Sequence, residues 1–295
     1  MVGKSLVEEI KGIFSRKKIL DNLNRTLIAL IPKIQGPETL GNYCPIGLCN
    51  TVYKVITKVL VARIRSFLDK LVSPLQTAFV PGRKGIDNAI IVQEIVHSIS
   101  KAKGKEGFMA IKIDLEKAYD KLEWGFIRER LLDFKFPMDL VETIMSCISI
   151  VSTSILFNGG MLEPIDPSRG IKQGDPLSPY IYILCMEFLG QLIEGKCIAK
   201  LWNPVKASRS GSSFSHLFFA DDLVLFAKAN QANCIAIREV LDTFCEKYRQ
   251  TISESKSRVF FSLNVDLESR EEICGLLGFR ATSSIGKYLG IPIIH

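Results

Sequence analysis

The sequence places a carboxylate at the end of the apolar run Phe108-Met-Ala-Ile-Lys-Ile-Asp114, and a pair of carboxylates inside His216-Leu-Phe-Phe-Ala-Asp-Asp-Leu-Val-Leu-Phe-Ala227. Apolar runs of this length predict buried strands. Aspartate is a poor strand residue, and an acidic group at the tip of a buried strand needs a charge partner or a cation. The two stretches therefore mark a candidate site at strand ends.

The adjacent acids Asp221 and Asp222 allow two interpretations. Because aspartate tolerates turn geometry, the pair can be the turn of a hairpin. A hairpin turn, however, prefers Asn-Gly or Asp-Gly, and two neighbouring carboxylates repel unless a positive charge lies between them. Oxygen-only ligands suit magnesium. With Asp114, the three carboxylates have the composition of a two-metal phosphoryl-transfer site.

Length and composition describe a globular chain. Of its 295 residues, 47% are hydrophobic and 23% charged, which excludes a disordered tail, a collagen-like repeat and a Gly/Pro linker. There are 38 Lys and Arg against 31 Asp and Glu, and the net charge of +7 permits a polyanionic partner. The eight cysteines are scattered without a CxxC pair, so we expect no zinc site and reduced, intracellular thiols.

No segment is expected to cross a membrane. The longest charge-free run, 143–162, is rich in Ser and Thr and contains Asn158-Gly159-Gly160, which is a hairpin signal. A signal peptide is not expected either, because charges follow the first residues in place of an apolar core.

Periodicity and turn signals predict a mixture of helices and strands. Val52 to Leu71 carries an apolar stripe at helical spacing, and Pro137 should interrupt a helical stretch from Trp124 to Ser149. Further helices are predicted over 87–101, 176–193 and 232–248, and strands over 27–31, 108–113, 150–157, 216–220, 223–227 and 259–262, with another beginning at 288. Residues 37–45 are predicted to form a loop.

Three motifs resemble the successive palm motifs of reverse transcriptases. They are Ile113-Asp-Leu-Glu-Lys-Ala-Tyr-Asp120, Gly170-Ile-Lys-Gln-Gly-Asp-Pro-Leu-Ser-Pro179 and Phe219-Ala-Asp-Asp222, and their order and gaps agree with that family. Further strings resemble plant non-LTR (LINE-type) retrotransposons: Leu30–Lys33, Leu48–Asn50, Tyr53-Lys54, Gln76–Arg83, Ser257–Ser262 and Tyr288–Ile293. A lone Asp-Asp pair is a weak signal, whereas the ordered set, which runs from about residue 22 to the end, is specific.

The resemblance implies an α+β right-hand polymerase fold, with an antiparallel palm sheet backed by helices and with helical fingers. It divides the chain into a basic N-terminal segment (1–22), fingers (23–107) and a palm (108–295) with a fingers-type insertion around 124–168. The palm is expected to be truncated at the primer-grip strand, so that the thumb is missing.

The implied activity is that of an RNA-directed DNA polymerase, which adds dNTPs to the 3′-hydroxyl of a DNA primer on an RNA template. The resemblance assigns two Mg²⁺ ions, which Mn²⁺ could replace, to Asp114, Asp221, Asp222 and the backbone carbonyl of Leu115. One ion would lower the pKa of the primer hydroxyl and the other would steady the triphosphate. Lys256 would be the general acid for pyrophosphate. A nuclear location is what the family implies.

The resemblance also implies residues that bind nucleotide or template. Tyr119 would be a sugar gate whose ring excludes a ribose 2′-hydroxyl, and the alternative is a core aromatic. Gln173 and Gly174 would form a turn beneath the templating base pair, where glycine allows close backbone approach. Arg83 and Lys33 would contact the template or the triphosphate, although a solvated lysine is an equally good interpretation of Lys33.

Three positions depart from the family pattern. Cys44 stands where the family has Arg, and Gly47 stands where it has Ser. Losing the Arg removes a permanent charge and a bidentate donor from a region that meets the nucleic acid or nucleotide. Arg249 stands near a usual Ser-Gly pair and would strain a turn that needs a positive φ.

Two functional hypotheses stay open at this point. The chain is an active polymerase domain, or it is a truncated, catalytically inactive retrotransposon remnant that at most binds nucleic acid. The intact acids favour the first, and Cys44 with the missing thumb favours the second. A maturase-like splicing factor would need an intron-binding extension, and a nucleotidyl cyclase would lack the 170–179 motif.

Overall fold

The computed structural model describes residues 2–20, 23–157, 159–208 and 211–294. They form two compact units, Met1–Phe67 with Tyr119–Cys185, and Leu68–Ala118 with Met186–His295. Asn158 of the predicted hairpin turn and residues 1, 21 and 22 of the predicted N-terminal segment lie outside the described residues. The division into fingers and palm stays a prediction.

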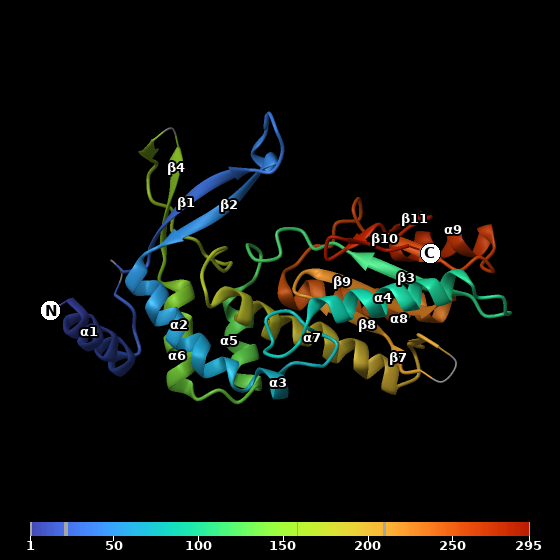
Figure 1. Cartoon of the computed structure of the whole chain (residues 1–295), viewed down its shortest axis with the longest axis horizontal. Helices are drawn as coiled ribbons and strands as arrows, with labels where there is room; N and C mark the ends of the chain where they lie inside the picture. The colour runs from blue at the N-terminus through green and yellow to red at the C-terminus, as the bar shows by residue number, and fades with distance from the viewer. Residues whose placement is uncertain (1, 21–22, 158, 209–210, 295) are drawn as a thin grey trace. The chain divides into compact units, whose positions relative to one another are not determined.

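The first unit combines a small sheet with helices (Figure 1). Its strands are β1 (Arg25–Pro32), β2 (Tyr43–Cys49), β4 (Ser152–Phe157) and β5 (Gly160–Met161), and its helices are α1 (Val2–Arg16), the 3₁₀ helix η2 (Leu40–Asn42), α2 (Thr51–Arg65), α5 (Trp124–Asp133) and α6 (Met138–Ser149). The strand order is β2-β1-β4-β5, with β1 antiparallel to β2 and parallel to β4.

The second unit contains the larger sheet. Its strands are β3 (Phe108–Ile113), β6 (Val205–Lys206), β7 (Ser213–Phe214), β8 (His216–Phe219), β9 (Asp222–Lys228), β10 (Arg258–Phe261), β11 (Arg280–Thr282), β12 (Lys287–Tyr288) and β13 (Ile291–Pro292), and its helices are α3 (Leu68–Leu71), α4 (Gly85–Ser100), α8 (Gln231–Tyr248) and α9 (Leu267–Leu277). Helix α7 (Ser178–Ile198) begins in the first unit and ends in the second. Among the described residues, no helix is long and apolar enough to cross a bilayer.

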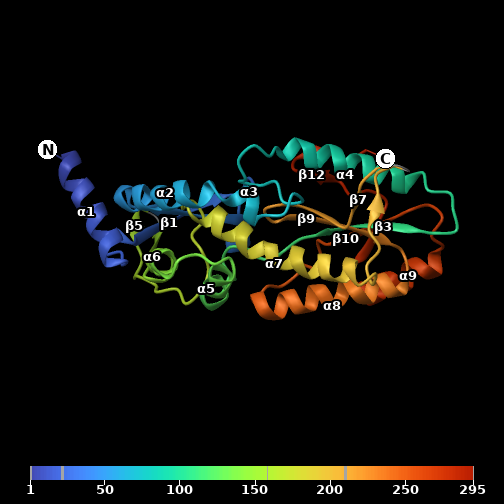
Figure 2. The same ribbon diagram turned by 90° about the horizontal axis from the view of Figure 1, so that it is seen from below.

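The five-stranded sheet has the order β11-β10-β3-β9-β8, and only its β10–β11 pair is parallel. Its central strand β3 is apolar on both faces, because Ala110 and Ile111 point in opposite directions and both are fully buried. Helix α4 packs on one face, where Val92 joins the core of Ala110 and Phe226. Figure 2 shows α4 and β12 on that side of the sheet and α7 and α8 on the other. An antiparallel-rich sheet backed by helices is confirmed.

One predicted helix is wrong in its extent. The apolar stripe of Val52 to Leu71 predicts a single helix, but α2 ends at Arg65 and α3 begins at Leu68. The Ser66 hydroxyl donates to the Arg63 carbonyl oxygen at 3.0 Å and so competes with the helical backbone bonds. By contrast, β3 has its predicted bounds, and Pro137 separates α5 from α6 as expected.

Two strands and one helix also differ from the expectations. Strand β2 begins inside the predicted 37–45 loop, because it pairs with all but the first residue of β1. The strand predicted from Tyr288 is the short β12–β13 hairpin, whose turn residues Leu289 and Gly290 both have positive φ. Helix α9 was not predicted, although its Asp266 N-cap and the Gly278 that follows it are sequence signals of helix ends.

Replacing Arg249 with glycine is expected to stabilise the protein. Arg249 ends α8 with a φ of 57°, as the resemblance implies, and a β-carbon is unfavourable in that left-handed conformation. Arg249→Gly should raise the free energy of unfolding by about 1 kcal/mol. Urea denaturation measures the change. Arg249→Ala keeps the β-carbon and should give no gain, so an equal gain in both variants would contradict this account.

Candidate active site

The two acidic stretches meet at one end of the five-stranded sheet. Strand β3 ends at Ile113, which pairs with Leu223 of β9, so one further step along the antiparallel register brings Asp114 beside Asp222. Phe219 pairs with Asp222, which leaves Ala220 and Asp221 as the two residues of the β8–β9 turn. The hairpin-turn and cation-site interpretations of the Asp221–Asp222 pair are therefore compatible. Asp221 lies in the turn, and Asp222 begins β9.

The three carboxylates affect one another electrostatically. Asp222 is half-buried, and burial raises the pKa of its carboxyl group. The charges of Asp221 and Asp114 raise this pKa further, while nearby Lys112 lowers it. A cation among these oxygens would relieve the repulsion.

The backbone of Asp114 is fixed from both sides. Its N–H donates to the Ser257 hydroxyl oxygen at 3.1 Å, and its carbonyl oxygen accepts from the Ser253 N–H at 2.8 Å. Between Ser253 and Ser257, the Lys256 ammonium group lies 3.7 Å from the Asp114 carboxylate, and 70% of the lysine side chain is exposed. The predicted lysine thus lies at the acidic site, and its catalytic role stays a prediction.

The donor chemistry of this cluster fits a divalent cation. Its side-chain ligands would be carboxylate oxygens, the type that magnesium prefers. Leu115, whose carbonyl is a further predicted ligand, is held in place by an antiparallel bridge to Ile252. Over the described ranges, no three His, Cys, Asp or Glu side chains lie close enough to form a ready-made metal cage. The site therefore has suitable ligands that a bound ion would still have to draw together.

Arg83 makes contacts that the sequence does not predict. Its guanidinium group donates to backbone carbonyl oxygens of four residues in the preceding segment: Asp69, Val72, Ser73 and Gln76. The side chain thus fastens residues 69–76 to the turn that carries it. Its predicted contact with template or triphosphate stays a prediction.

In the first unit, the Gln173-Gly174 turn packs closely against β2. The Gly47 N–H donates to the Gln173 carbonyl oxygen at 2.7 Å, and a β-carbon on Gly47 would come within 2.9 Å of that oxygen. Gly174 has a φ of 98°, and a β-carbon there would lie 3.0 Å from the Gly47 carbonyl oxygen. The Cys44 sulfur lies 3.7 Å from Gln173 Oε1. Both departures on β2, Cys44 and Gly47, therefore touch the predicted template-binding turn.

The other two predicted nucleotide-binding residues also lie in the first unit. The Tyr119 ring stacks on the buried Tyr182 ring, with centroids 4.6 Å apart and planes 7° from parallel. This stacking fixes the plane of the predicted sugar gate. Lys33 is exposed just after β1, and its ammonium group lies 3.5 Å from the Gly41 carbonyl oxygen. Both roles stay predictions.

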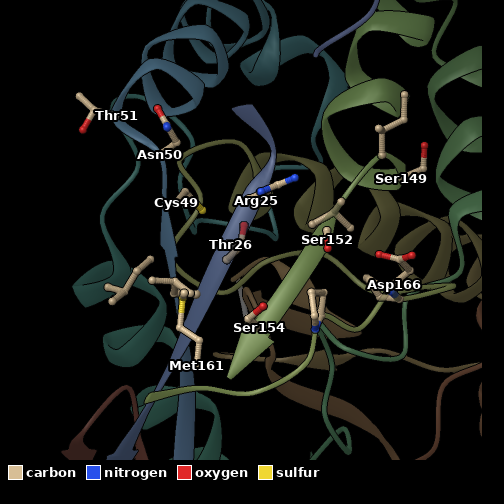
Figure 3. A pocket seen from close by; sticks show the side chains of 16 residues that line it. Arg25, Thr26, Cys49, Asn50, Thr51, Ser149, Ser152, Ser154, Met161 and Asp166 are labelled. Carbon is tan, nitrogen blue, oxygen red and sulfur yellow. The ribbon is translucent and has the colours of Figure 1, made fainter. Parts of the chain in front are cut away.

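One cavity of the first unit lies away from the predicted site residues. It has a volume of about 1170 Å³ and is lined by hydroxyl-bearing side chains such as Thr51, Ser149 and Ser152, with Arg25 and Asp166 (Figure 3). No predicted site residue lines it. A second cavity in the same unit, of about 350 Å³, is lined by Gln173 together with Gly47 and Asp120.

The sequence matches the family described as "Reverse transcriptase (RNA-dependent DNA polymerase)" over residues 31–293. The chain belongs to this family. The palm-type motifs and the antiparallel sheet with acids at its end agree with that membership, and the resemblance stated from the motifs is confirmed at the level of the family.

Relatives of this reverse transcriptase domain include proteins of transposable elements. It is 29% identical over 212 residues to a Pol polyprotein of the type-2 retrotransposable element R2DM of Drosophila melanogaster, covering 72% of this chain and 19% of that one. It is 26% identical over 186 residues to the "Transposon TX1 uncharacterized 149 kDa protein" of Xenopus laevis, covering 63% and 14%. The chain thus spans less than a fifth of these relatives. Its likeness to non-LTR elements is confirmed.

Telomerase structures share the fold of this chain. Apo telomerase from Candida tropicalis superposes with a TM-score of 0.57 at 14% identity, covering 83% of this chain and 51% of that one. Telomerase from Candida albicans, in complex with a fragment of telomeric RNA, gives 0.55 at 14% identity, covering 88% and 45%. The predicted α+β right-hand polymerase class is confirmed.

A buried polar network supports the 170–179 motif. Asp175 is 3% exposed; its carboxylate accepts from the Tyr53 hydroxyl at 2.6 Å and from the Leu177 N–H at 3.1 Å. The Lys172 ammonium group lies 4.1 Å above the Tyr53 ring and bonds to Asn24 Oδ1, and burial lowers the pKa of this lysine. The sequence predicts no role for these residues, since nothing local indicates which segment covers them.

Replacing Tyr53 with phenylalanine is expected to destabilise this domain. The ring and its contact with Lys172 would remain, but the buried Asp175 carboxylate would lose a hydrogen-bond donor. We expect the free energy of unfolding to fall by about 2 kcal/mol, measured by urea denaturation. Tyr43→Phe, a change on β2 outside this network, is the control. A loss below about 0.5 kcal/mol would show that Asp175 does not need the hydroxyl.

Proposed function

We propose that this domain extends a DNA primer on an RNA template by transferring a nucleotidyl group from a dNTP to the primer 3′-hydroxyl. The observation that carries the proposal is the gathering of Asp114, Asp221 and Asp222 at one end of the five-stranded sheet. Membership of the reverse transcriptase family supports the choice of reaction. The curated relatives are much longer, so the activity is proposed for this domain alone.

The proposed metal ligands are the carboxylates of Asp114, Asp221 and Asp222 and the carbonyl oxygen of Leu115. Two magnesium ions bound there would supply the charge that lowers the pKa of the primer hydroxyl and neutralises the triphosphate, and Mn²⁺ is a possible substitute. Lys256, whose ammonium group lies 3.7 Å from the Asp114 carboxylate, would give a proton to the departing pyrophosphate.

Five residues have proposed roles in substrate binding. Tyr119 would exclude a ribose 2′-hydroxyl with a ring that Tyr182 holds in one plane. Gln173 and Gly174 would lie beneath the templating base pair on a backbone fixed against β2. Arg83 and Lys33 would contact the template or the triphosphate.

We further propose that the domain comes from a plant LINE-type element and acts in the nucleus. A match of 40% over 67 residues to the "Uncharacterized mitochondrial protein AtMg01250" of Arabidopsis thaliana supports the plant assignment, although it covers 23% of this chain. The alternative of an inactive remnant is less well supported, because the acids of the motifs are intact and are brought together by the fold.

Primer extension tests the proposal. The purified chain would receive an RNA template, an annealed DNA primer, dNTPs and Mg²⁺, beside an Asp221→Ala control. We expect extension that requires Mg²⁺ and disappears in the control. Absence of extension while template–primer binding is retained would favour the inactive remnant, and Cys44→Arg would then be the first variant to test for restored activity.

A further inference from the structure

The β8–β9 turn holds Asp221 on a strained backbone. Ala220, the first turn residue, has a φ of 52°. A residue with a β-carbon is unfavourable in this left-handed region, so the surrounding structure must hold it there. Asp221 follows directly, and the direction of its carboxylate depends on this turn.

The Gln76 side chain, which comes from outside the sheet, forms a hydrogen bond with the turn. Its side-chain oxygen Oε1 accepts a hydrogen bond from the Ala220 N–H at 3.1 Å and another from the Ala78 N–H at 3.0 Å. The residue is 1% exposed, so no water can replace this acceptor. Its Nε2 atom has no hydrogen-bond partner among the described residues. The side chain of this glutamine therefore acts as a hydrogen-bond acceptor.

The segment that carries Gln76 is attached along the edge of β8. The Phe218 N–H donates to the Leu75 carbonyl oxygen at 2.8 Å, and the Thr77 N–H donates to the Phe218 carbonyl oxygen at 3.1 Å. Asn88 of α4 donates a third hydrogen bond, to the same Phe218 oxygen. These bonds bring Gln76 level with Phe218, two residues before Ala220.

Arg83 fixes the same segment from its other side. Its Nη1 atom donates to the Gln76 carbonyl oxygen at 2.7 Å, and Nη2 donates to the Val72 carbonyl oxygen at 2.9 Å. The Ser73 N–H, in the middle of this segment, donates to the buried Glu187 carboxylate of α7. The planar fork of an arginine can serve several carbonyls at once, which a lysine cannot do.

We infer that Gln76 and Arg83 are positioning residues of the catalytic carboxylates. Gln76 holds Ala220 in its left-handed conformation and thereby directs Asp221, and Arg83 keeps Gln76 in place. The inference rests on the proposed function for its catalytic consequence, but the structural link to the cation site stands without it. Neither residue has to touch the substrate.

A matched pair of substitutions at position 76 tests the inference. Gln76→Met has a similar length and lacks the acceptor, whereas Gln76→Glu keeps an acceptor oxygen. We expect Gln76→Met to lower kcat for primer extension about tenfold, with KM for dNTP and Kd for template–primer unchanged. Gln76→Glu should retain clearly more activity. Mn²⁺ binding, followed by electron paramagnetic resonance, should weaken several-fold in Gln76→Met and less in Gln76→Glu.

A second substitution distinguishes a positioning role from a loss of stability in Gln76→Met. Glycine adopts the left-handed conformation without strain, so Ala220→Gly should restore part of the lost kcat and Mn²⁺ affinity when added to Gln76→Met. A purely structural role for Gln76 would not predict this rescue.

Arg83→Lys keeps the charge of the side chain and loses the planar fork of the guanidinium group. We expect it to lower kcat and Mn²⁺ affinity as Gln76→Met does, whereas preserved kcat and Mn²⁺ affinity with only a changed dNTP KM would overturn the positioning role of Arg83 and point to a direct phosphate contact alone.

The outcomes separate this inference from the proposed function. If the wild-type chain does not extend primers, but Gln76→Met weakens Mn²⁺ binding in the same direction as Asp221→Asn, the function fails and the positioning role stands. If the wild-type chain is active and Gln76→Met matches it in kcat and Mn²⁺ affinity, the positioning role is overturned. A Gln76→Met defect that Ala220→Gly leaves unchanged also overturns it.

Discussion

Replacing Asp114 with asparagine is expected to lower the rate of primer extension about 10³-fold while template–primer binding is retained. The substitution keeps the size of the side chain but removes a charge from the proposed metal site, and a loss of this size corresponds to about 4 kcal/mol of transition-state stabilisation. The hydrogen bonds that fix this residue to Ser253 and Ser257 use only its backbone, so the local fold should persist. Gel assays of primer extension under single-turnover conditions measure the rate.

Two further variants calibrate this result. Glu116→Gln removes an exposed acid two residues away and should leave the rate unchanged. Asp222→Asn should cost less than Asp114→Asn, because the resemblance implies that Asp222 is a second-line ligand of the ions. An Asp114→Asn variant that keeps more than about a tenth of wild-type activity would contradict the two-metal assignment.

Acidification is expected to destabilise the fold through His216. This side chain is 3% exposed in β8, its Nδ1 atom lies 3.0 Å from the Ser215 hydroxyl, and its ring lies against Phe218. Burial lowers the pKa of His216 to about 3 from an ordinary 6.5. Below pH 6.5 the unfolded chain therefore takes up a proton that the folded chain does not, and stability falls by up to about 1.4 kcal/mol per pH unit until the folded pKa is reached.

Urea denaturation at pH 7, 6 and 5 measures this dependence. His216→Gln cannot take up the proton and should show a shallower loss of unfolding free energy than the wild-type chain over this range. His97→Gln, the same change on an exposed position of α4, is the control and should leave the slope unchanged. Equal slopes for the wild-type chain and His216→Gln would show that this histidine does not contribute to acid sensitivity.

Local sequence patterns were sufficient where the structure follows from a single segment. The apolar run before Asp114 predicts β3 with its observed bounds, because a strand buried on both faces must be continuously apolar. The positive φ of Arg249, by contrast, was predicted from the resemblance, because the family has a Ser-Gly pair near this position. Strand β2 was not predicted, and its first residues were assigned to a loop, because pairing with β1, rather than its own sequence, makes it a strand.

The sequence by itself determined the family, the order of the motifs and the identity of the acids at the sheet end. Only the tertiary structure decided how those acids are supported: Ser257 at Asp114, Gln76 at the β8–β9 turn, and Arg83 on four backbone carbonyls. The physical reason is the range of the interactions. A hydrophobic period reflects neighbours along the chain, whereas the partner of a buried hydrogen-bonding side chain depends on which distant segment packs beside it.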